Sequence, residues 1–278
     1  MTARRRTLPQ ALNFLVTNRL PRRLATRVIG RISKVEAWPV APLALLAWKS
    51  FCDVDLSDAA EPRFRSLHQG FTRALRPGAR SFDSDPGVLC SPCDAILGAH
   101  GVIVSGRMLQ VKGMPYTLGE LAGEEIASRM EGGFFATLRL TAGMYHRFHA
   151  PADLTIEAVT HIPGDCWNVN PPALARVAAL YCRNERATIS ARLADGSPLL
   201  LVPVAAVLVA GIRLHALGLL RGGASFATLA LTVRKGDELG WFEHGSTIVL
   251  LAPPGYGKVS GTAEDDPIRA GQPLLHRA

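Results

Sequence analysis

No acidic residue occurs before Glu36, although the first 34 residues carry nine arginines and lysines. These nine account for the net charge of +8, because the other basic residues nearly balance the 23 acidic residues of the whole chain. The body of the protein is therefore close to neutral, which argues against a basic surface spread over the whole molecule. A positive charge confined to one end indicates an anionic partner there, either nucleic acid or anionic lipid.

The sequence also lacks an apolar run long enough to cross a bilayer. Its longest run, residues 199–212, has 14 residues and contains Pro203, whereas a spanning helix needs roughly 18. That run is rich in valine and is predicted to be a buried strand. No apolar segment of adequate length follows the N-terminal arginines, so we expect no secretory leader. An arginine-rich, acid-free start also resembles an organelle transit peptide, but this one is poor in serine.

Cysteine is scarce, with five residues at positions 52, 90, 93, 166 and 182. An odd and scattered set predicts reduced thiols in a cytosolic compartment. Cys90 and Cys93 form a lone C-x-x-C pair, and a zinc site would need a second pair at ligand spacing. We therefore expect no metal site. Charged residues make up only 19% of the chain and hydrophobic residues 48%, which is enough for a sizeable core.

The N-terminal charge is combined with apolar residues at helical spacing. An apolar side chain recurs at every fourth position from Leu20 to Ile32, with arginines between, and Pro21 suits the start of a helix. A basic amphipathic helix lies on a membrane surface rather than spanning the bilayer. We therefore predict that residues 1–50 form a basic, amphipathic, membrane-associating helical region, and we favour lipid over nucleic acid as its partner. The alternative is a helix packed against the protein's own body.

From about residue 87 the pattern changes to short strands separated by glycine and proline. The expected strands cover 101–105, 107–111, 134–140, 154–162, 188–193, 199–212, 228–233 and 247–251. One helical segment, 117–130, interrupts them. The sequence thus predicts an α+β fold with a mostly antiparallel β body and helices gathered at the N-terminus. We treat residues 51–278 as a single domain.

Gly245 and Ser246 directly precede residues 247–251, a run with a strong preference for β-structure. A serine hydroxyl there can attack the carbonyl group in front of it, and glycine leaves that carbonyl unshielded. The chain could therefore cut itself at this peptide bond. Most Gly-Ser pairs are ordinary turns, however, and a nucleophile needs a base that is oriented by an acid.

The candidate bases lie in residues 145–151, Tyr-His-Arg-Phe-His-Ala-Pro. His146 and His149 would face opposite ways on an extended backbone and would share a face on a helical turn. Their spacing alone leaves structural, acid–base and metal-binding roles open. The candidate acid is Asp94, in the sequence Cys-Ser-Pro-Cys-Asp-Ala of residues 90–95, where an aspartate is normally a cap or turn residue.

Together these segments resemble the phosphatidylserine decarboxylase family, the pyruvoyl-dependent enzymes of phospholipid synthesis. The resemblance runs from about residue 50 to the end of the chain. Its segments, in the family's order, are 109–113 with 116–118, 145–151, 162–165 with 169–170, 183–186, 244–247 and 271–274. The chain departs from the family in having His244 where leucine is usual and Ala95 where glycine is usual. It also has Gly143 and Met144 where an acidic residue is common.

The resemblance implies a proenzyme that processes itself. Asp94, His149 and Ser246 would form a triad that acts once, on the chain itself. Asp94 would fix the imidazole tautomer, His149 would take the hydroxyl proton, and Ser246 would attack the carbonyl of Gly245. The products would be chains 1–245 and 246–278, with a covalent pyruvoyl group, derived from Ser246, at the start of the second. No external cofactor would be needed.

The resemblance further implies decarboxylation of phosphatidylserine to phosphatidylethanolamine. His149 would then supply a proton to the carbanion, and His146 would position the carboxylate or phosphate of the substrate. The expected location is peripheral, on the cytoplasmic side of the cell membrane, with phosphatidylserine in an anionic membrane as partner. A homodimer is left open. The alternatives are a pyruvoyl decarboxylase of another amino-group substrate and a lipid-binding protein that does not process.

Overall fold

The computed structural model describes residues 22–111, 114–206, 211–220, 222–243 and 246–277. The described helices are α2 (Arg22–Ile32), α3 (Val40–Phe51), α4 (Leu67–Phe71), α5 (Leu118–Ala122), α6 (Glu124–Arg129), α7 (Pro171–Leu174) and α8 (Leu180–Arg183). The first strands are β1 (Val88–Cys90), β2 (Ala95–Val102), β3 (Arg107–Val111), β4 (Met114–Thr117), β5 (Phe134–Leu140), β6 (Arg147–His149), β7 (Leu154–Ile162) and β8 (Arg186–Leu193). The remaining strands are β9 (Pro198–Ala205), β10 (Ile212–Leu214), β11 (Gly218–Leu219), β12 (Ser225–Val233), β13 (Glu238–Phe242), β14 (Ser246–Ala252), β15 (Tyr256–Lys258), β16 (Pro267–Ile268) and β17 (Pro273–Arg277).

The centre of the molecule is an eight-stranded sheet with the order β12-β7-β8-β9-β14-β5-β2-β16. Every pair of neighbours in it is antiparallel. Strand β14 lies between β9 and β5, and all seven of its residues are buried. A strand of consecutive apolar residues is typical of a sheet that is covered on both faces, so β14 forms part of the hydrophobic core.

Three smaller sheets surround this one: β11-β10-β13-β6, β1-β17-β15 and the hairpin β3-β4. The prediction of an α+β fold with a mostly antiparallel β body and N-terminal helices is confirmed. Strands β3, β5 and β7 have the predicted bounds. The single strand predicted for 199–212 is wrong, because β9 ends at Ala205 and Ile212 begins β10 in another sheet.

Local backbone features explain the other differences. The predicted helix 117–130 is divided into α5 and α6 by Gly123, whose φ of 100° lies outside the helical range. The strand predicted for 101–105 is largely wrong, since β2 ends at Val102 and the chain turns at Ser105 and Gly106, both with positive φ.

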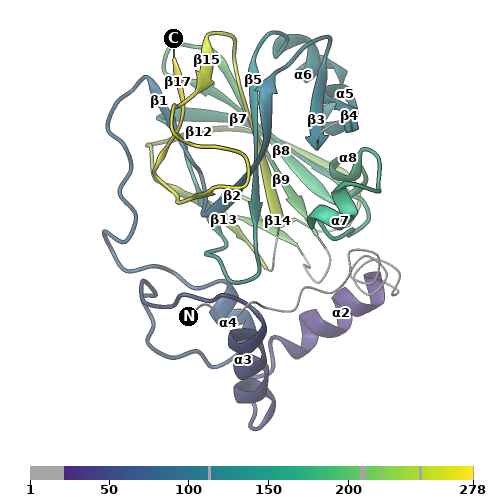
Figure 1. Cartoon of the computed structure of the whole chain (residues 1–278), viewed down its shortest axis with the longest axis vertical. Coiled ribbons are helices and arrows are strands. Elements are labelled where there is room, and N and C mark those ends of the chain that lie inside the picture. The colour runs from purple at the N-terminus through teal and green to yellow at the C-terminus, as the bar shows by residue number, and fades with distance from the viewer. Residues whose placement is uncertain (1–21, 112–113, 207–210, 221, 244–245, 278) are drawn as a thin grey trace.

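The N-terminal helices lie together below the β body in Figure 1 and contact the loop between β5 and β6. The indole of Trp48 on α3 stacks on Phe71 of α4, with ring centroids 4.8 Å apart. Its Nε1 donates a hydrogen bond of 2.8 Å to the carbonyl of Ala142. Arg147 at the start of β6 donates to the carbonyls of Thr72 and Arg73, just after α4. These helices are therefore docked on the body by specific contacts.

The apolar stripe of α2 does not contribute to this docking. Leu24, Val28 and Ile32 are 57%, 42% and 46% exposed, whereas Thr26 is buried. The prediction that this helix is amphipathic holds for the described part, but its apolar side faces outward. Predictions for residues 1–21 lie outside the described residues.

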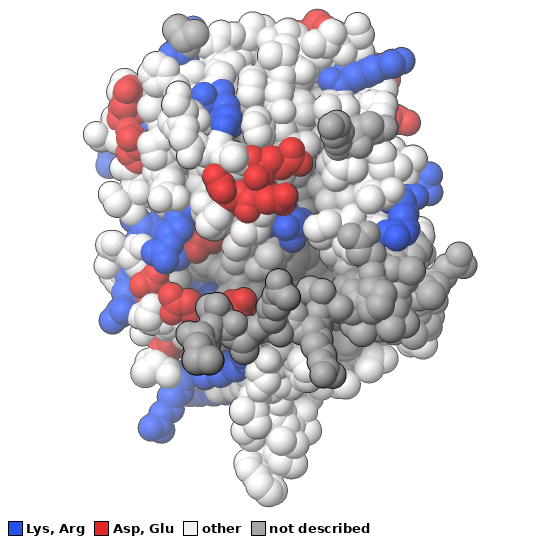
Figure 2. All heavy atoms as spheres, viewed as in Figure 1, with Lys and Arg blue, Asp and Glu red and all other residues white. Residues whose placement is uncertain are grey.

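A second apolar surface projects below the body in Figure 2, where its tip is free of charged side chains. Its exposed members belong to α3 or precede it: Trp38, Val40, Leu43, Leu46 and Phe51. Among the described residues, no helix is both long and apolar enough to cross a membrane.

The docking of α3 can be tested by substituting its buried tryptophan. We expect Trp48→Ala to destabilise the contact of α3 with α4 by about 3–5 kcal/mol, the usual cost of truncating a buried tryptophan. Urea unfolding combined with limited proteolysis in the segment 33–66 measures the effect. Trp38→Ala is the matched control, because Trp38 is 85% exposed and its loss leaves no cavity. Equal stability of the two variants would contradict the docking contact.

Candidate active site

Ser246 is the first residue of β14 and has no exposed surface. It pairs with Leu140 on β5 and with Ala205 on β9, so its backbone is held on both sides. Its Oγ has no hydrogen-bond partner among the residues that the structure describes. A buried hydroxyl without a partner is costly, and one that a core strand keeps in place is a candidate for chemistry rather than for stability.

Neither histidine lies in a helix, and β6 begins directly after His146, which excludes the shared face of a helical turn. His149 ends β6 and is partly exposed, whereas His146 comes just before β6 and is fully buried. The ring of His146 lies 5.1 Å from that of Phe71, between centroids. Its carbonyl accepts a 3.0 Å hydrogen bond from the amide of Phe242, four residues before Ser246. The two histidines therefore occupy different environments.

The hydrogen bonds of His149 determine its tautomer. Nδ1 lies 2.9 Å from the carbonyl oxygen of Gly236, which can only accept, so Nδ1 carries the proton. The lone pair of Nε2 then accepts a 3.0 Å hydrogen bond from the hydroxyl of Tyr145. Burial lowers the pKa of His149 below its ordinary value of 6.5. At neutral pH this histidine is therefore an uncharged base with a fixed orientation.

Gly236 can present its carbonyl in this way only because it is glycine. Its φ is 91°, and a Cβ atom there would lie 3.0 Å from the ring of Phe82. The same ring lies 5.5 Å from His149, measured between centroids. A side chain at position 236 would therefore disturb both the turn and the packing of the imidazole.

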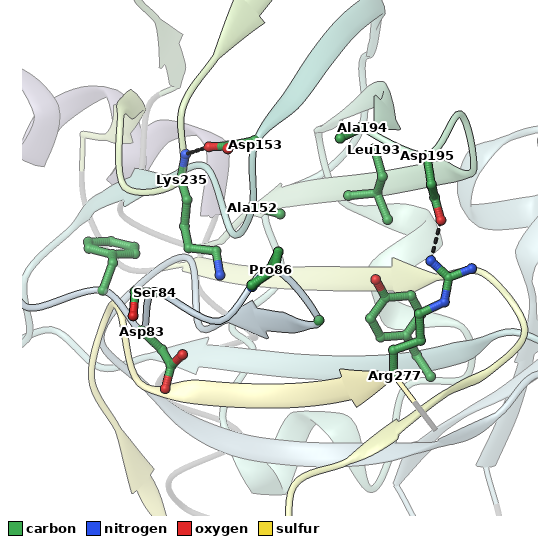
Figure 3. A pocket seen from close by; sticks show the side chains of 13 residues that line it. Asp83, Ser84, Pro86, Ala152, Asp153, Leu193, Ala194, Asp195, Lys235 and Arg277 are labelled. Carbon is green, nitrogen blue, oxygen red and sulfur yellow. Dashed lines mark hydrogen bonds and ion pairs between the residues drawn. The ribbon is translucent and has the colours of Figure 1, made fainter.

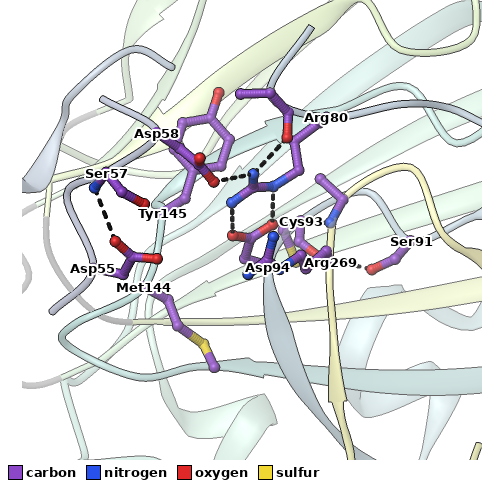
Figure 4. Close-up of polar contacts among 12 residues, drawn as sticks. Asp55, Ser57, Asp58, Arg80, Ser91, Cys93, Asp94, Met144, Tyr145 and Arg269 are labelled. Atoms are coloured by element: carbon purple, nitrogen blue, oxygen red, sulfur yellow. Dashed lines mark hydrogen bonds and ion pairs between the residues drawn. The ribbon is translucent and has the colours of Figure 1, made fainter. Parts of the chain in front are cut away.

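Asp94 forms an ion pair with Arg80 rather than a hydrogen bond with His149. Figure 4 shows the guanidinium of Arg80 between the carboxylates of Asp58 and Asp94. The pair with Asp94 is bidentate, with Nε–Oδ1 and Nη2–Oδ2 distances of 2.9 Å and 2.5 Å. The amide of Ala270 donates a third hydrogen bond of 2.9 Å to Oδ1. These bonds hold the carboxylate in place, and its hydrogen bond with Arg80 raises the pKa of that guanidinium.

The structure nevertheless brings Asp94 and Ser246 to one end of the central sheet, whereas His149 lies on β6 in another sheet. Ile96 of β2 pairs with Arg139 of β5, so Asp94 lies near the level at which Leu140 pairs with Ser246. Because β5 separates β2 from β14, their backbones are about 10 Å apart there, or two strand spacings. The charge of Asp94 acts on His149 through space and opposes the lowering of its pKa by burial. Gly245 lies outside the described residues.

Three residues of this arrangement were not selected from the sequence. Arg80 gave no local signal, since it is one of several arginines between residues 51 and 85. Tyr145 was visible only as a neighbour of the histidines. Gly236 could have been found as a Lys-Gly-Asp turn before β13, but nothing in that pattern indicates which side chain its carbonyl binds.

A cavity of about 530 Å³ lies beyond Phe82. Figure 3 shows Lys235 extending along it and Arg277 reaching Asp195. Lys235 donates through Nζ to the carbonyls of Asp85 and Val88. The cations of this cavity are thus already engaged, which makes it a poor site for an anionic ligand. Within the described ranges, no three His, Cys, Asp or Glu side chains are placed to hold a metal ion.

Comparison with known proteins gives a consistent result. The family model described as "Phosphatidylserine decarboxylase" matches residues 67–276. A Shewanella putrefaciens protein named "Phosphatidylserine decarboxylase proenzyme" is 35% identical over 247 residues, which cover 84% of this chain and 85% of that protein. Proteins of the same name from Xanthomonas euvesicatoria pv. vesicatoria and Xanthomonas campestris pv. campestris are 36% and 37% identical over 236 residues. Those matches cover 81% of this chain and 84% and 83% of the relatives.

The state of His149 can be tested by titration. Because its folded pKa is below 6.5, the unfolded chain binds the proton more readily, and His149 should reduce the stability of the folded protein as the pH falls below about 6.5.

Tyr145→Phe removes the donor to Nε2 of His149, so the neutral imidazole loses a hydrogen bond and its pKa should rise toward the ordinary value. Imidazole nitrogen NMR measures the shift, and Tyr181→Phe serves as a control with a buried tyrosine elsewhere. An unchanged pKa in Tyr145→Phe would contradict the assigned hydrogen bond.

Proposed function

The chain belongs to the phosphatidylserine decarboxylase family, and we propose that it converts phosphatidylserine to phosphatidylethanolamine with a pyruvoyl group made from its own Ser246. The relatives' shared name supports the reaction, and the word "proenzyme" in that name supports processing of the chain. The observation that carries the proposal is the buried Oγ of Ser246, which has no partner among the described residues.

The environment of Ser246 fits a covalent group at the start of β14. A hydroxyl without a partner there can be lost without breaking a hydrogen bond to any described residue. From Thr247 onward the strand keeps its ladders to β5 and β9, while residue 246 gives up only its own backbone nitrogen. When present, a pyruvoyl group would supply an electron sink for the carbanion that remains after carbon dioxide leaves.

Self-processing would begin with attack of the Ser246 Oγ on the carbonyl carbon of Gly245. The C–N bond breaks, so that an ester to Oγ replaces the amide and the nitrogen of residue 246 becomes a free amine. Removal of the Cα proton of residue 246 then breaks the Cβ–Oγ bond, which leaves dehydroalanine on chain 246–278 and a carboxylate on Gly245. Water hydrolyses the dehydroalanine to a pyruvoyl group and releases ammonia.

The base for this attack would be His149, which is neutral and carries its lone pair on Nε2. That lone pair is occupied by the hydroxyl of Tyr145, so the two groups must separate before Nε2 can take the proton of Ser246. The carbonyl of Gly236 would hold the tautomer, which is the task that the family resemblance implied for Asp94. Asp94 would then stabilise the imidazolium through space, with Arg80 keeping the carboxylate in position.

In the decarboxylation itself, His149 is the proposed proton donor to the substrate carbon, because it is the partly exposed histidine. His146 is the proposed group for positioning the carboxylate or phosphate of the substrate. Since its ring has no exposed surface, that role requires the packing against Phe71 to open when substrate enters.

The membrane is the proposed site of action, with the protein peripheral on the cytoplasmic side. Two surfaces support this proposal: the outward apolar stripe of α2 and the uncharged projection of α3. Apolar patches of this kind on a soluble protein mark interaction sites, and the adjoining arginines favour an anionic surface. The sequence pointed to the charged helix but gave less weight to Val40–Phe51, where Lys49 is the one charged residue.

One observation favours a second function, that of a lipid-binding protein which does not process. Asp94 and His149 are each fully engaged with other partners, Arg80 for the first and Tyr145 and Gly236 for the second. If these bonds never rearrange, Ser246 has no base. The family's chemistry could also act on another amino-group substrate, but the membrane-facing surfaces favour a lipid.

We expect Ser246→Ala to yield one uncut chain without decarboxylase activity, because one hydroxyl serves as both nucleophile and pyruvoyl precursor. A denaturing gel, the intact mass of fragment 246–278 and release of carbon dioxide from phosphatidylserine provide the measurements. Thr188→Val is the matched control, since it also removes a buried hydroxyl with no described partner. Cleavage before residue 246 in Ser246→Ala would refute self-processing by this serine, and an uncut parent chain would favour the lipid-binding alternative.

The membrane proposal predicts that the double variant Leu43→Ser, Leu46→Ser binds anionic vesicles roughly tenfold or more weakly, as measured by sedimentation. Burial of each leucine in the bilayer would contribute about 1.5–3 kcal/mol, and the variant loses both contributions. Self-cleavage should be unaffected. The control is Val104→Ser with Leu109→Ser, which removes exposed apolar side chains from the opposite part of the body. Equal vesicle binding by all three proteins would argue against α3 as a membrane contact.

A further inference from the structure

A cavity of about 660 Å³ lies between helix α2 and the β body. One wall is formed by helix α2, from residues next to its exposed apolar stripe. The other wall comes from loops that lie far apart in the sequence. The charged residues that line the cavity are Arg27, Arg31 and Lys34 on the first wall and Asp165, Glu185 and Glu243 on the second.

Two of the three cations in this cavity have no acidic partner among the described residues. Lys34 is paired with Glu243 at 3.0 Å. Glu185 accepts from His161 at 3.2 Å. In the part of the chain that the structure describes, no acidic group lies within ion-pair distance of Arg27 or Arg31. The cavity therefore offers two guanidinium groups to an anion.

The spacing of these arginines suits a phosphate. Residues four apart on a helix lie on the same face, with Cβ atoms about 5–6 Å apart. Two planar guanidinium groups at that separation can each donate a pair of hydrogen bonds to the oxygens of one phosphodiester. Arginine is preferred for this geometry over lysine, which acts as a point charge.

The cavity also has the right position for a lipid head group. Glu243, on its wall, precedes Ser246 by three residues, which is at most about 10 Å of chain. On the same helix, the exposed Leu24, Val28 and Ile32 form the apolar stripe that runs beside Arg27 and Arg31. Helix α2 therefore presents an apolar stripe and, beside it, the arginine-bearing wall of a cavity that also contains Glu243, three residues before Ser246.

We propose that Arg27 and Arg31 form a subsite for the phosphodiester of the phosphatidylserine head group. The inference rests on the proposed function, because it takes the serine lipid as substrate and Ser246 as the reacting position. The two arginines hold the phosphate, the acyl chains remain on the bilayer side of α2, and the serine end points toward the start of β14. The subsite thus distinguishes a phosphorylated serine lipid from free serine.

The test uses the processed enzyme and a soluble competitor, glycerophosphoserine, which has the head group but no acyl chains. Phosphatidylserine in detergent micelles is the substrate, and the variant carries both Arg27→Gln and Arg31→Gln. We expect the inhibition constant of glycerophosphoserine to rise about tenfold for each arginine replaced, because each replacement removes a charge-assisted hydrogen bond to the phosphate. The KM for phosphatidylserine should rise in parallel, while self-cleavage remains complete. The control is Arg107→Gln with Arg129→Gln, which removes the same charge from exposed positions on the body.

A rise in the KM for phosphatidylserine with an unchanged inhibition constant would overturn the subsite, because the arginines would then act only by attracting the membrane. Absence of inhibition of the parent enzyme by glycerophosphoserine would overturn it as well. Inorganic phosphate is the second probe, and stronger inhibition by it than by glycerophosphoserine would assign the cavity to free phosphate instead. Failure of the proposed function is recognised separately, since the parent chain would then remain uncut or release no carbon dioxide from phosphatidylserine.

Discussion

The candidate site depends on one constraint, the hydrogen bonding of β14 on both sides at its first residue. Ser246 is paired with Leu140 and with Ala205, and it lies in a strand with no exposed residue. The ladders fix the backbone at this point and so restrict where the Oγ of Ser246 can lie. This oxygen has no hydrogen-bond partner among the described residues. The stability of the core thereby supports a local arrangement that is unfavourable by itself, as is common at reactive sites.

Around this serine the backbone performs tasks that side chains were expected to perform. The carbonyl of Gly236 fixes the proton on Nδ1 of His149, and the amide of Ala270 helps to hold Asp94. Asp94 and Arg80 form a rigid pair whose charge reaches His149 only through space. Such an arrangement keeps the imidazole neutral and oriented, while its Nε2 is protected by Tyr145 until that hydroxyl moves away. One hydrogen bond of His149 therefore orients the base for the proposed chemistry, and the other must break before that base can act.

The sequence predicted the elements whose pattern is local and missed those that depend on distant partners. The aromatic and apolar residues of β5 and the alternating, β-branched residues of β7 identified both strands with their bounds. The apolar run 199–212 carried no sign of the break between β9 and β10, because the second strand joins a different sheet. Motifs selected Asp94, His149 and Ser246, but the pairing of Asp94 with Arg80 joins residues from two loops and has no spacing that could reveal it. Likewise, the helical period of α2 located its apolar side without indicating that this side faces outward.

The position of β14 has a consequence for a chain that is cut before Ser246. Residues 246–277 contribute β14 to the middle of the central sheet, β16 to its edge beside β2, and β17 beside β1. The two pieces would remain interlocked as a heterodimer without any covalent link, because the smaller piece cannot leave unless the sheet itself opens. Refolding after denaturation would then require two chains to meet, so recovery would depend on protein concentration, although the original folding of the uncut chain did not. Cleavage would thus turn the folding of one chain into the assembly of two.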